Sequence, residues 1–288
     1  MKIAVIGSAN ADLVTKTNKL PKPGETLIGE SFFIGEGGKG LNQAVAASRI
    51  GGDVNFFGAI GKDTHGEFLL ESMKKNNLKV KNIKICEQIK TGIANIMLCD
   101  GENSIVIVAG ANNKCNIEYI NSIKEKILEC DIIVLQLEIP LDTVEFIINL
   151  AYKNNKKIIL NPAPAMKLSK EIVDKVSYII PNEHEYKVVL DTENAMEKEL
   201  KKYPNKLIIT NGENGVWYFD GKEVVNIPAK KVKVIDTTGA GDTFVGTFAG
   251  AIANKFALKE AIEFGVKCSG ISVTKLGAQG GMPYLKDL

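Results

Sequence analysis

The stretch Asp236-Thr-Thr-Gly-Ala-Gly-Asp-Thr-Phe244 decides the fold and marks where chemistry is expected. It follows the apolar run Val232–Ile235, which predicts a strand, and it precedes Val245–Ala253, whose small and apolar residues predict a buried helix. A glycine-rich bend that opens a helix directs free backbone N–H groups at one point, where the helix dipole adds partial positive charge. The segment Gly239-Ala240-Gly241 is therefore predicted to bind an anion.

Asp242 follows directly, in the first turn of the predicted helix. A carboxylate at this place faces the anion site and can accept the proton of an attacking hydroxyl. Acidic residues are also common in first turns because they interact favourably with the helix dipole, so a purely structural role is the alternative. The Gly-x-Gly sequence beside Asp242 favours catalysis, since helix capping does not require it.

Apolar runs and helical patterns alternate along most of the chain outside this stretch. The alternation predicts an α/β fold with a central, mostly parallel β-sheet flanked by helices. No linker or internal repeat interrupts the 288 residues, so residues 1–288 are expected to form a single domain. The predicted strands of the sheet are Ile3–Ile6, Val54–Ile60, Ile132–Gln136, Lys157–Leu160, Tyr178–Ile180 and Leu207–Thr210.

Two segments depart from this alternation, at about residues 11–36 and 91–110. Each contains short, partly polar strands, and the second is a candidate hairpin whose turn includes Asp100 and Gly101. We expect these strands to form a small β lid outside the main sheet.

Composition excludes several classes of function. The 36 basic and 34 acidic residues are interspersed and nearly cancel, so we expect no nucleic-acid or membrane partner. Arg49 is the only arginine, which restricts any arginine-finger mechanism to one candidate. The five cysteines are scattered, without a C-x-x-C pair, which argues against a disulfide framework and favours a cytoplasmic protein. An anion bound by this chain must therefore be held by a few residues at one site, because the sequence provides no broad basic surface.

Polar residues follow several of the predicted strands. Asn10 and Asp12 come after the first, Glu138 after another, and Asn182 and Glu185 after a third. Open α/β sheets bind ligands at the carboxyl ends of their strands, and paired Asn and Asp side chains suit vicinal hydroxyls. Each residue alone has a structural alternative as an Asx turn or a helix cap. Their common position favours a polar binding site.

The segment Gly35–Gly40 matches G-x-G-x-x-G, a pattern found in dinucleotide-binding proteins. In those proteins it follows the first strand, whereas here the first strand, Ile3–Ile6, ends in a different turn. Lys39 does not belong to a Walker loop either, because Gly40 occupies the place of the required Ser or Thr. An oxidoreductase is therefore a weaker alternative.

Taken together, the motifs resemble those of the ribokinase-like family of sugar and nucleoside kinases, and the full set is most similar to ribokinases. The resemblance runs from Lys2 to about Pro283. It is carried in order by Asn10–Asp12, Pro23–Thr26, Gly37–Ala44, Leu135–Glu138, Asn161–Ala165, Pro181–Glu185 and Asp236–Asp242.

The resemblance implies the roles of individual residues. Asp242 would be the base for the primary hydroxyl, and Gly239, Ala240 and Gly241 would bind the developing phosphoryl charge. The residues implied to bind the sugar, besides Asp242, are Asn10, Asp12, Gly38, Lys39, Gly40, Asn42 and Glu138.

It also implies ATP as phosphoryl donor, Mg²⁺, and K⁺ as an activator. Glu185 would order the magnesium, through water. ATP would contact Gly241, Asp242, Asn182, Thr210, Asn211, Gly212, Glu213, Asn214 and Gly215. The monovalent cation would be held by Asp236, Thr238, Ser272, Lys275, Gly277 and Gly281, the last in place of a serine often found there.

The function implied is ATP-dependent phosphorylation of D-ribose at the 5-hydroxyl, giving ribose 5-phosphate and ADP, by a homodimer joined through the β lid. A kinase for 2-deoxyribose or a nucleoside is the alternative within the family. A dinucleotide-binding oxidoreductase and a non-catalytic sugar-binding regulator are the alternatives from other classes.

Overall fold

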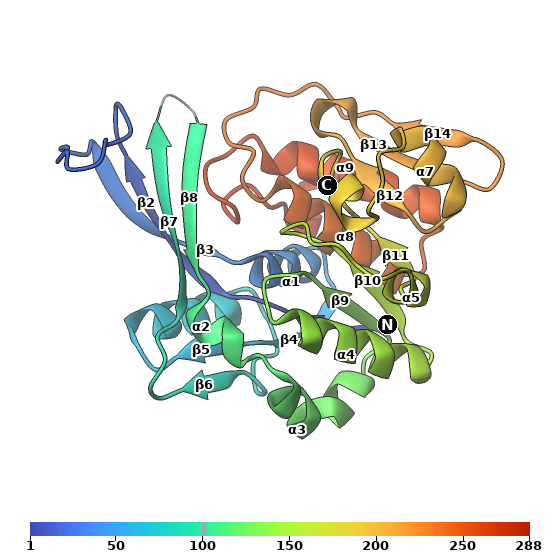
Figure 1. The fold of residues 1–288 in the computed structure, drawn as a ribbon, viewed down its shortest axis with the longest axis horizontal. Helices are drawn as coiled ribbons and strands as arrows, with labels where there is room; N and C mark the ends of the chain where they lie inside the picture. Colours follow the sequence, from blue (N-terminus) through green and yellow to red (C-terminus); the bar gives the residue numbers. More distant parts are fainter. Residues whose placement is uncertain (100–101) are drawn as a thin grey trace.

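The computed structural model describes residues 1–99 and 102–288. Its central sheet has five strands, all parallel, in the order β11-β10-β9-β1-β4 (Figure 1). This confirms the predicted class, because each crossover between parallel strands requires a helix or a long connection. The strands are β1 (Lys2–Ile6), β4 (Asp53–Phe57), β9 (Ile132–Leu135), β10 (Lys157–Leu160) and β11 (Tyr178–Ile179).

Helices cover both faces of this sheet. Successive residues of a strand point to opposite faces, so Ile3 and Val5 of β1 lie in one buried cluster while Ala4 and Ile6 lie in the other. Helices α1 (Lys39–Arg49), α2 (Thr64–Lys75), α8 (Ala240–Ala253) and α9 (Leu258–Ser272) contribute to the first cluster. Helices α3 (Ile117–Leu128), α4 (Leu141–Lys153) and α5 (Lys170–Lys175) contribute to the second.

A smaller antiparallel sheet continues the fold beyond β11. Parallel bridges join Ile179 to Leu207 and Asn182 to Thr210, which brings this sheet beside the edge of the central one. Helices α6 (Glu185–Val189) and α7 (Met196–Lys202) precede it, and its strands are β12 (Ile208–Thr210), β13 (Val216–Phe219) and β14 (Val224–Ile227). None of the described helices is both long enough and apolar enough to cross a membrane.

A four-stranded sheet, called here the outer sheet, extends away from the α/β body (Figure 1). Its strands lie in the order β3-β2-β7-β8, and β2 pairs antiparallel with β3 but parallel with β7. The turn predicted at Asp100 and Gly101 lies outside the described residues. The strands are β2 (Asn10–Lys16), β3 (Ser31–Gly37), β7 (Gly92–Cys99) and β8 (Glu102–Val108).

Three of the predicted strands are wrong in part or in whole. Leu207–Thr210 contains β12, which belongs to the smaller sheet, where it pairs antiparallel with β13, and not to the central one. Val232–Ile235 forms no strand; the segment is irregular, and the side chain of Val234 is 56% exposed. Val54–Ile60 is two strands, because the pairing partner changes at Gly58: β4 pairs with β1, whereas β5 (Ala59–Gly61) pairs with β6 (Lys84–Cys86). An apolar run in the sequence does not show whether the segment will be exposed or where its strand pairing will change.

Helix α8 is buried without interruption from Asp242 to Ala253 and packs against α1. The two helices approach so closely at Gly246 that a Cβ there would lie 2.3 Å from the backbone oxygen of Gln43 and 2.7 Å from the Cβ of Ala46. The contact holds α1 beside the N-terminal half of α8. The residues at both helix starts are thereby brought to one edge of the sheet.

We expect Gly246→Ala to destabilise the protein by about 1–3 kcal/mol, since the added methyl group must push α1 away from α8. Urea denaturation would measure the change. Gly270→Ala in α9 is the matched control, because a Cβ there meets no atom within 4 Å; removing a helical glycine should stabilise by roughly 0.5–1 kcal/mol. Equal stability of Gly246→Ala and the wild type would contradict the close-packing argument.

Candidate active site

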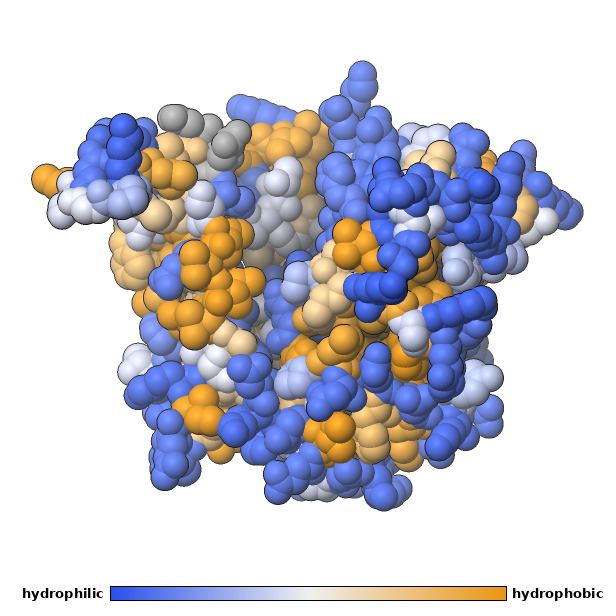
Figure 2. Space-filling model, in the orientation of Figure 1, coloured by the Kyte–Doolittle hydropathy of each residue, from blue (hydrophilic) through white to orange (hydrophobic). Residues whose placement is uncertain are grey.

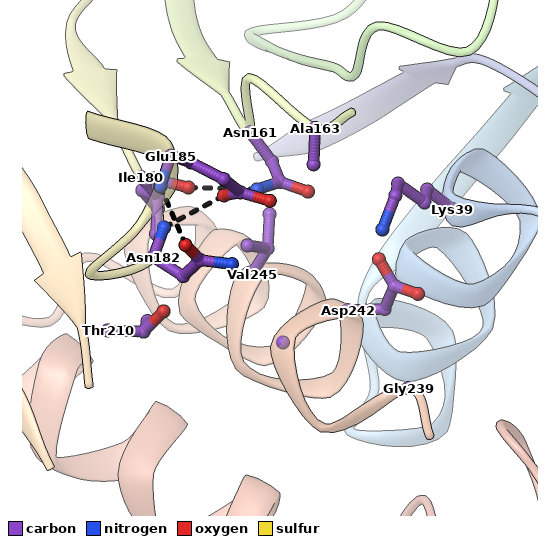
Figure 3. A pocket seen from close by; sticks show the side chains of 11 residues that line it. Lys39, Asn161, Ala163, Ile180, Asn182, Glu185, Thr210, Gly239, Asp242 and Val245 are labelled. Carbon is purple, nitrogen blue, oxygen red and sulfur yellow. Dashed lines mark hydrogen bonds between the residues drawn. The ribbon is translucent and has the colours of Figure 1, made fainter. Parts of the chain in front are cut away.

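A cavity of about 210 Å³ opens where the central strands end, between the first turns of α1 and α8 (Figure 3). Several of the predicted site residues meet there although they are far apart in the sequence. The lining residues are Lys39, Asn161, Ala163, Ile180, Asn182, Glu185, Thr210, Gly239, Gly241, Asp242 and Val245.

The start of α8 forms the predicted anion site. Gly239 caps the helix with φ +75°, and a Cβ there would lie 2.6 Å from the backbone oxygen of Ala278. Only glycine fits that backbone and that space. A Cβ at Gly241 would meet nothing within 4 Å, so the first turn is open towards the cavity. The N–H of Ala240 donates to the backbone oxygen of Thr237 at 3.2 Å, whereas those of Gly239 and Gly241 have no backbone acceptor among the described residues and can reach a bound anion.

Asp242 is 7% exposed, and each of its carboxylate oxygens accepts a hydrogen bond from an amide of α1. Asn42 Nδ2 donates to Oδ2 and Gln43 Nε2 donates to Oδ1, both at 3.0 Å. Lys39 and Asp242 point toward one another across the cavity (Figure 3). Burial alone would lower the pKa of Lys39, but Asp242, Glu138 and Glu185 raise it above its usual value, so the ammonium stays charged.

A further set of amides surrounds this pair, and the sequence analysis assigned no role to any of them. Gln43 Nε2 also donates to Asn161 Oδ1, and Gln136 Nε2 donates to Gln43 Oε1 at 2.6 Å. Gln279 Nε2 donates to Asn42 Oδ1 at 3.0 Å. The sequence contained one indication of a role at the site, since Gln136 and Asn161 directly follow the strands β9 and β10.

The predicted sugar-binding residues gather beside the cavity, on the side of the outer sheet. Glu138 accepts hydrogen bonds from Ser8 Oγ at 2.5 Å and from the backbone N–H of Lys39 at 3.0 Å. Asn112, which the sequence analysis missed, donates from Nδ2 to Asn10 Oδ1 at 2.7 Å. Asn10 therefore keeps its own NH₂ group available to a ligand.

Asp12 lies on β2 against Gly37 of β3, where a Cβ would come within 2.0 Å of Asp12 Oδ1. Burial raises the pKa of Asp12 to about 7, with further contributions from the negative charges of Glu138, Asp242 and Glu36. Three neighbouring carboxylates thus act on Asp12 at this end of the site.

The turn before α1 holds Lys39 in place. Gly38 caps α1 with φ +88°, and a Cβ at Gly40 would lie 2.6 Å from the backbone nitrogen of Ser8. Leu41 N–H donates to the backbone oxygen of Ser8 at 2.9 Å. Close backbone packing against the end of β1 thus explains the two glycines on either side of Lys39.

The opposite end of the cavity is lined by two of the residues predicted to contact ATP, Asn182 and Thr210, whereas the predicted contacts 211–215 are not among its lining residues. Asn182 Oδ1 accepts the N–H groups of His184 and Glu185, and Glu185 Oε2 accepts the N–H of Asn182 at 2.8 Å (Figure 3). Burial raises the pKa of Glu185. Thr210 lines the cavity, and Gly212–Asn214 form a short 3₁₀ turn directly after it.

The loop predicted to bind a monovalent cation is tied together by Asp236. Its oxygens accept the N–H groups of Thr238 at 2.9 Å and Gly277 at 2.8 Å. Burial would raise the pKa of Asp236, but the hydrogen bonds from Thr238 and Gly277 outweigh it and lower the pKa. A Cβ at Gly281 would lie 1.8 Å from the backbone oxygen of Ser272, so a serine does not fit here without rearrangement.

Within the described part of the chain, no three His, Cys, Asp or Glu side chains cluster as ligands for a metal ion. The site instead combines a buried carboxylate, a lysine ammonium and a helix N-terminus. Such a combination can take a proton from a hydroxyl and stabilise an anion at the same place.

Comparison with known proteins agrees with this chemistry. The model of the pfkB family of carbohydrate kinases matches residues 1–285. The ribokinase of Lactococcus lactis is 46% identical over 288 residues, covering 100% of this chain and 95% of the relative. The crystal structure of Thermotoga maritima ribokinase superimposes with a TM-score of 0.90 at 34% identity, covering 99% of this chain and 97% of that one.

Arabidopsis thaliana ribokinase complexed with ribose and ATP superimposes with a TM-score of 0.89 at 29% identity, covering 99% of this chain and 96% of that one. The match therefore spans the outer sheet as well as the α/β body. On this evidence, the chain belongs to the pfkB family of carbohydrate kinases.

Proposed function

We propose that this protein transfers the γ-phosphoryl group of ATP to the 5-hydroxyl of D-ribose. The observation that carries the proposal is the Asp242 carboxylate, held by two amides beside the open first turn of α8. The names of the relatives support ribose as the sugar, since full-length matches include ribokinases and one structure contains ribose and ATP.

In this reaction Asp242 accepts the proton of the 5-hydroxyl while the oxygen of that hydroxyl attacks the γ-phosphorus. The bond between the γ-phosphorus and the bridging oxygen breaks, which leaves ribose 5-phosphate and ADP. The N–H groups of Gly239-Ala240-Gly241 and the Lys39 ammonium stabilise the negative charge of the transferred group. The sugar is held by Asn10, Asp12, Gly38, Lys39, Gly40, Asn42 and Glu138.

ATP lies along the other end of the cavity, with Asn182 and the turn Thr210–Gly215 as its contacts. Glu185 offers carboxylate oxygens there, the donor type that magnesium prefers, and would hold the ion through water. Bound magnesium would neutralise phosphate charge and orient the γ-phosphoryl group.

A potassium ion is proposed to bind near Asp236, Thr238, Ser272, Lys275, Gly277 and Gly281. Oxygen donors suit such an ion, and Asp236 supplies a carboxylate whose lowered pKa keeps it charged. Asp236 already connects its loop to Gly277 through a hydrogen bond. The ion would further stabilise the conformation of this loop.

The outer sheet is proposed to act as the lid, because β2 carries Asn10 and Asp12 at the end nearest the cavity. It also exposes apolar side chains, among them Phe32 at 60% and Val106 at 65%, and Figure 2 shows apolar surface over this part of the molecule. A second copy of the chain that covers these strands would form the proposed homodimer. The buried thiols of Cys115 and Cys268 fit the predicted cytoplasmic location.

The test of this function is ADP formation with a panel of sugars and nucleosides. Ribose should exceed 2-deoxyribose in kcat/KM by about tenfold or more, because a buried polar group such as Asp12 loses its partner with the deoxy sugar. The 5-deoxy sugar should not react. Equal efficiency for both pentoses, or a preference for a nucleoside, would overturn ribose as substrate.

Omitting magnesium, or replacing potassium with sodium at constant ionic strength, should lower the rate.

Asp242→Asn should lower kcat by roughly 10²–10⁴-fold, since the amide keeps the size of the side chain but cannot accept the proton. The Kd for ribose, measured by calorimetry, should change far less. Asp142→Asn makes the same change in the first turn of α4 and should leave kcat unaltered. Near-normal turnover of Asp242→Asn would show that another group is the base.

Ribose affinity should depend on pH through Asp12. Its pKa of about 7 means that the carboxylate is ionised above pH 7 and protonated below, and an ionised acceptor binds hydroxyls more strongly. The Kd for ribose should therefore rise by up to about tenfold between pH 8 and pH 6. Asp12→Asn should bind ribose more weakly and with a Kd that no longer changes over this range; an unchanged pH dependence in this variant would assign the effect to another group.

A further inference from the structure

The orientation of Asp242 depends on two amide groups that could each be turned around. The NH₂ and oxygen ends of an amide have nearly the same shape but opposite hydrogen-bonding roles. If Asn42 or Gln43 were reversed, its oxygen would face a carboxylate oxygen and repel it. Something must therefore keep both NH₂ groups directed at Asp242.

Two glutamines outside the cavity do this. Gln279 Nε2 donates to Asn42 Oδ1, and Gln136 Nε2 donates to Gln43 Oε1. Each bond makes the oxygen of the inner amide an acceptor on the side away from Asp242, which leaves the NH₂ group for the carboxylate. Gln43 gives its second hydrogen to Asn161, so its orientation is determined at both ends.

Both glutamines are themselves buried, with exposed fractions of 0% for Gln136 and 5% for Gln279. Within the described residues, the Oε1 atom of each is buried and accepts no hydrogen bond. A buried carbonyl without a partner is destabilising. A side chain present only for stability would more favourably be apolar at these two places, which points to a role in the site.

The backbone on both sides supports these placements. Arg49, the single arginine, donates from Nη1 to the backbone oxygen of Gln279 at 2.5 Å and to that of Met282 at 3.1 Å. Gln136 Oε1 occupies the space beside Gly7, where a Cβ would lie only 2.1 Å from it. Each glutamine therefore has its position set by the chain around it.

We propose that Gln136 and Gln279 are positioning residues for phosphoryl transfer, which orient Asp242 by fixing the amides of Gln43 and Asn42. Neither touches the cavity, and both act through the carboxylate. The inference rests on the proposed role of Asp242 as the base.

The test compares Gln136→Met and Gln279→Met with Gln88→Met, the same change at an exposed glutamine. The first two should lower kcat for ribose by about tenfold each, as expected for a lost orienting hydrogen bond. The KM for ATP should not change. The unfolding midpoint should change little, because each substitution removes an unpartnered Oε1 atom but leaves the oxygen of Gln43 or Asn42 without its donor. Gln88→Met should match the wild type in all three measurements.

The Asp242→Asn background separates positioning from general damage. There the same glutamine substitutions should leave the residual rate unchanged, because no carboxylate is left to orient. An equal fall in that background, together with a lower unfolding midpoint, would assign the glutamines a purely structural role and overturn the proposal. Wild-type kcat in folded Met variants would also overturn it.

If the Met variants do not fold, Gln136→Leu and Gln279→Leu replace them, since leucine also has no hydrogen-bond donor but a shorter side chain. Folded Leu variants should lose kcat to a similar extent, and undiminished kcat would refute the positioning role. A wild-type protein that does not phosphorylate ribose would instead refute the proposed function, so the two failures are distinguishable.

Discussion

A carboxylate buried at the start of a buried helix is the constraint around which the site is organised. Removing such a group from water is costly unless hydrogen bonds replace the lost solvation. For Asp242 both replacements come from neighbouring residues of α1, Asn42 and Gln43. This requires α1 to lie against α8, and the absence of a side chain at Gly246 permits that distance. The geometry around Asp242 and the packing of one sheet face therefore have a common cause.

The second feature is an excess of negative charge around the cavity. The charges of Glu138 and Asp242 act on Asp12, and that of Asp242 acts on Glu185. The Lys39 ammonium interacts with Asp242, Glu138 and Glu185. A triphosphate adds more negative charge. We therefore propose that its binding relies on the N-terminus of α8 and on Lys39. Burial, followed by the neighbouring carboxylates, raises the pKa of Asp12 to about 7.

Much of this arrangement follows from the sequence for physical reasons. Parallel strands all end at the same edge, so the polar residues that follow them, such as Asn10, Glu138 and Asn182, were predicted to meet, and the glycines before Asp242 indicated an open helix start. The partners of Asp242 were not predicted. A glutamine such as Gln136 has no preferred role, and its hydrogen-bond partner 93 positions away depends on tertiary packing.

The errors in the fold have the same origin. Val232–Ile235 has the composition of a strand, but among the described residues it pairs with no strand, and its side chains are exposed at the surface. In the outer sheet, Phe32 and Phe33 resemble core residues in composition, yet both are exposed. Local composition predicts that a segment is extended or helical; only the partners around it determine where it lies.

The contact between Asp12 and Gly37 also limits how this enzyme could evolve. The carboxylate of Asp12 occupies the volume that a side chain at position 37 would need, so the two positions cannot drift independently. A longer residue at position 12, or any side chain at 37, would have to be accompanied by a shift of β3. A change of sugar specificity at this end of the site would thus first require a different spacing of β2 and β3. Only then could another residue replace Asp12.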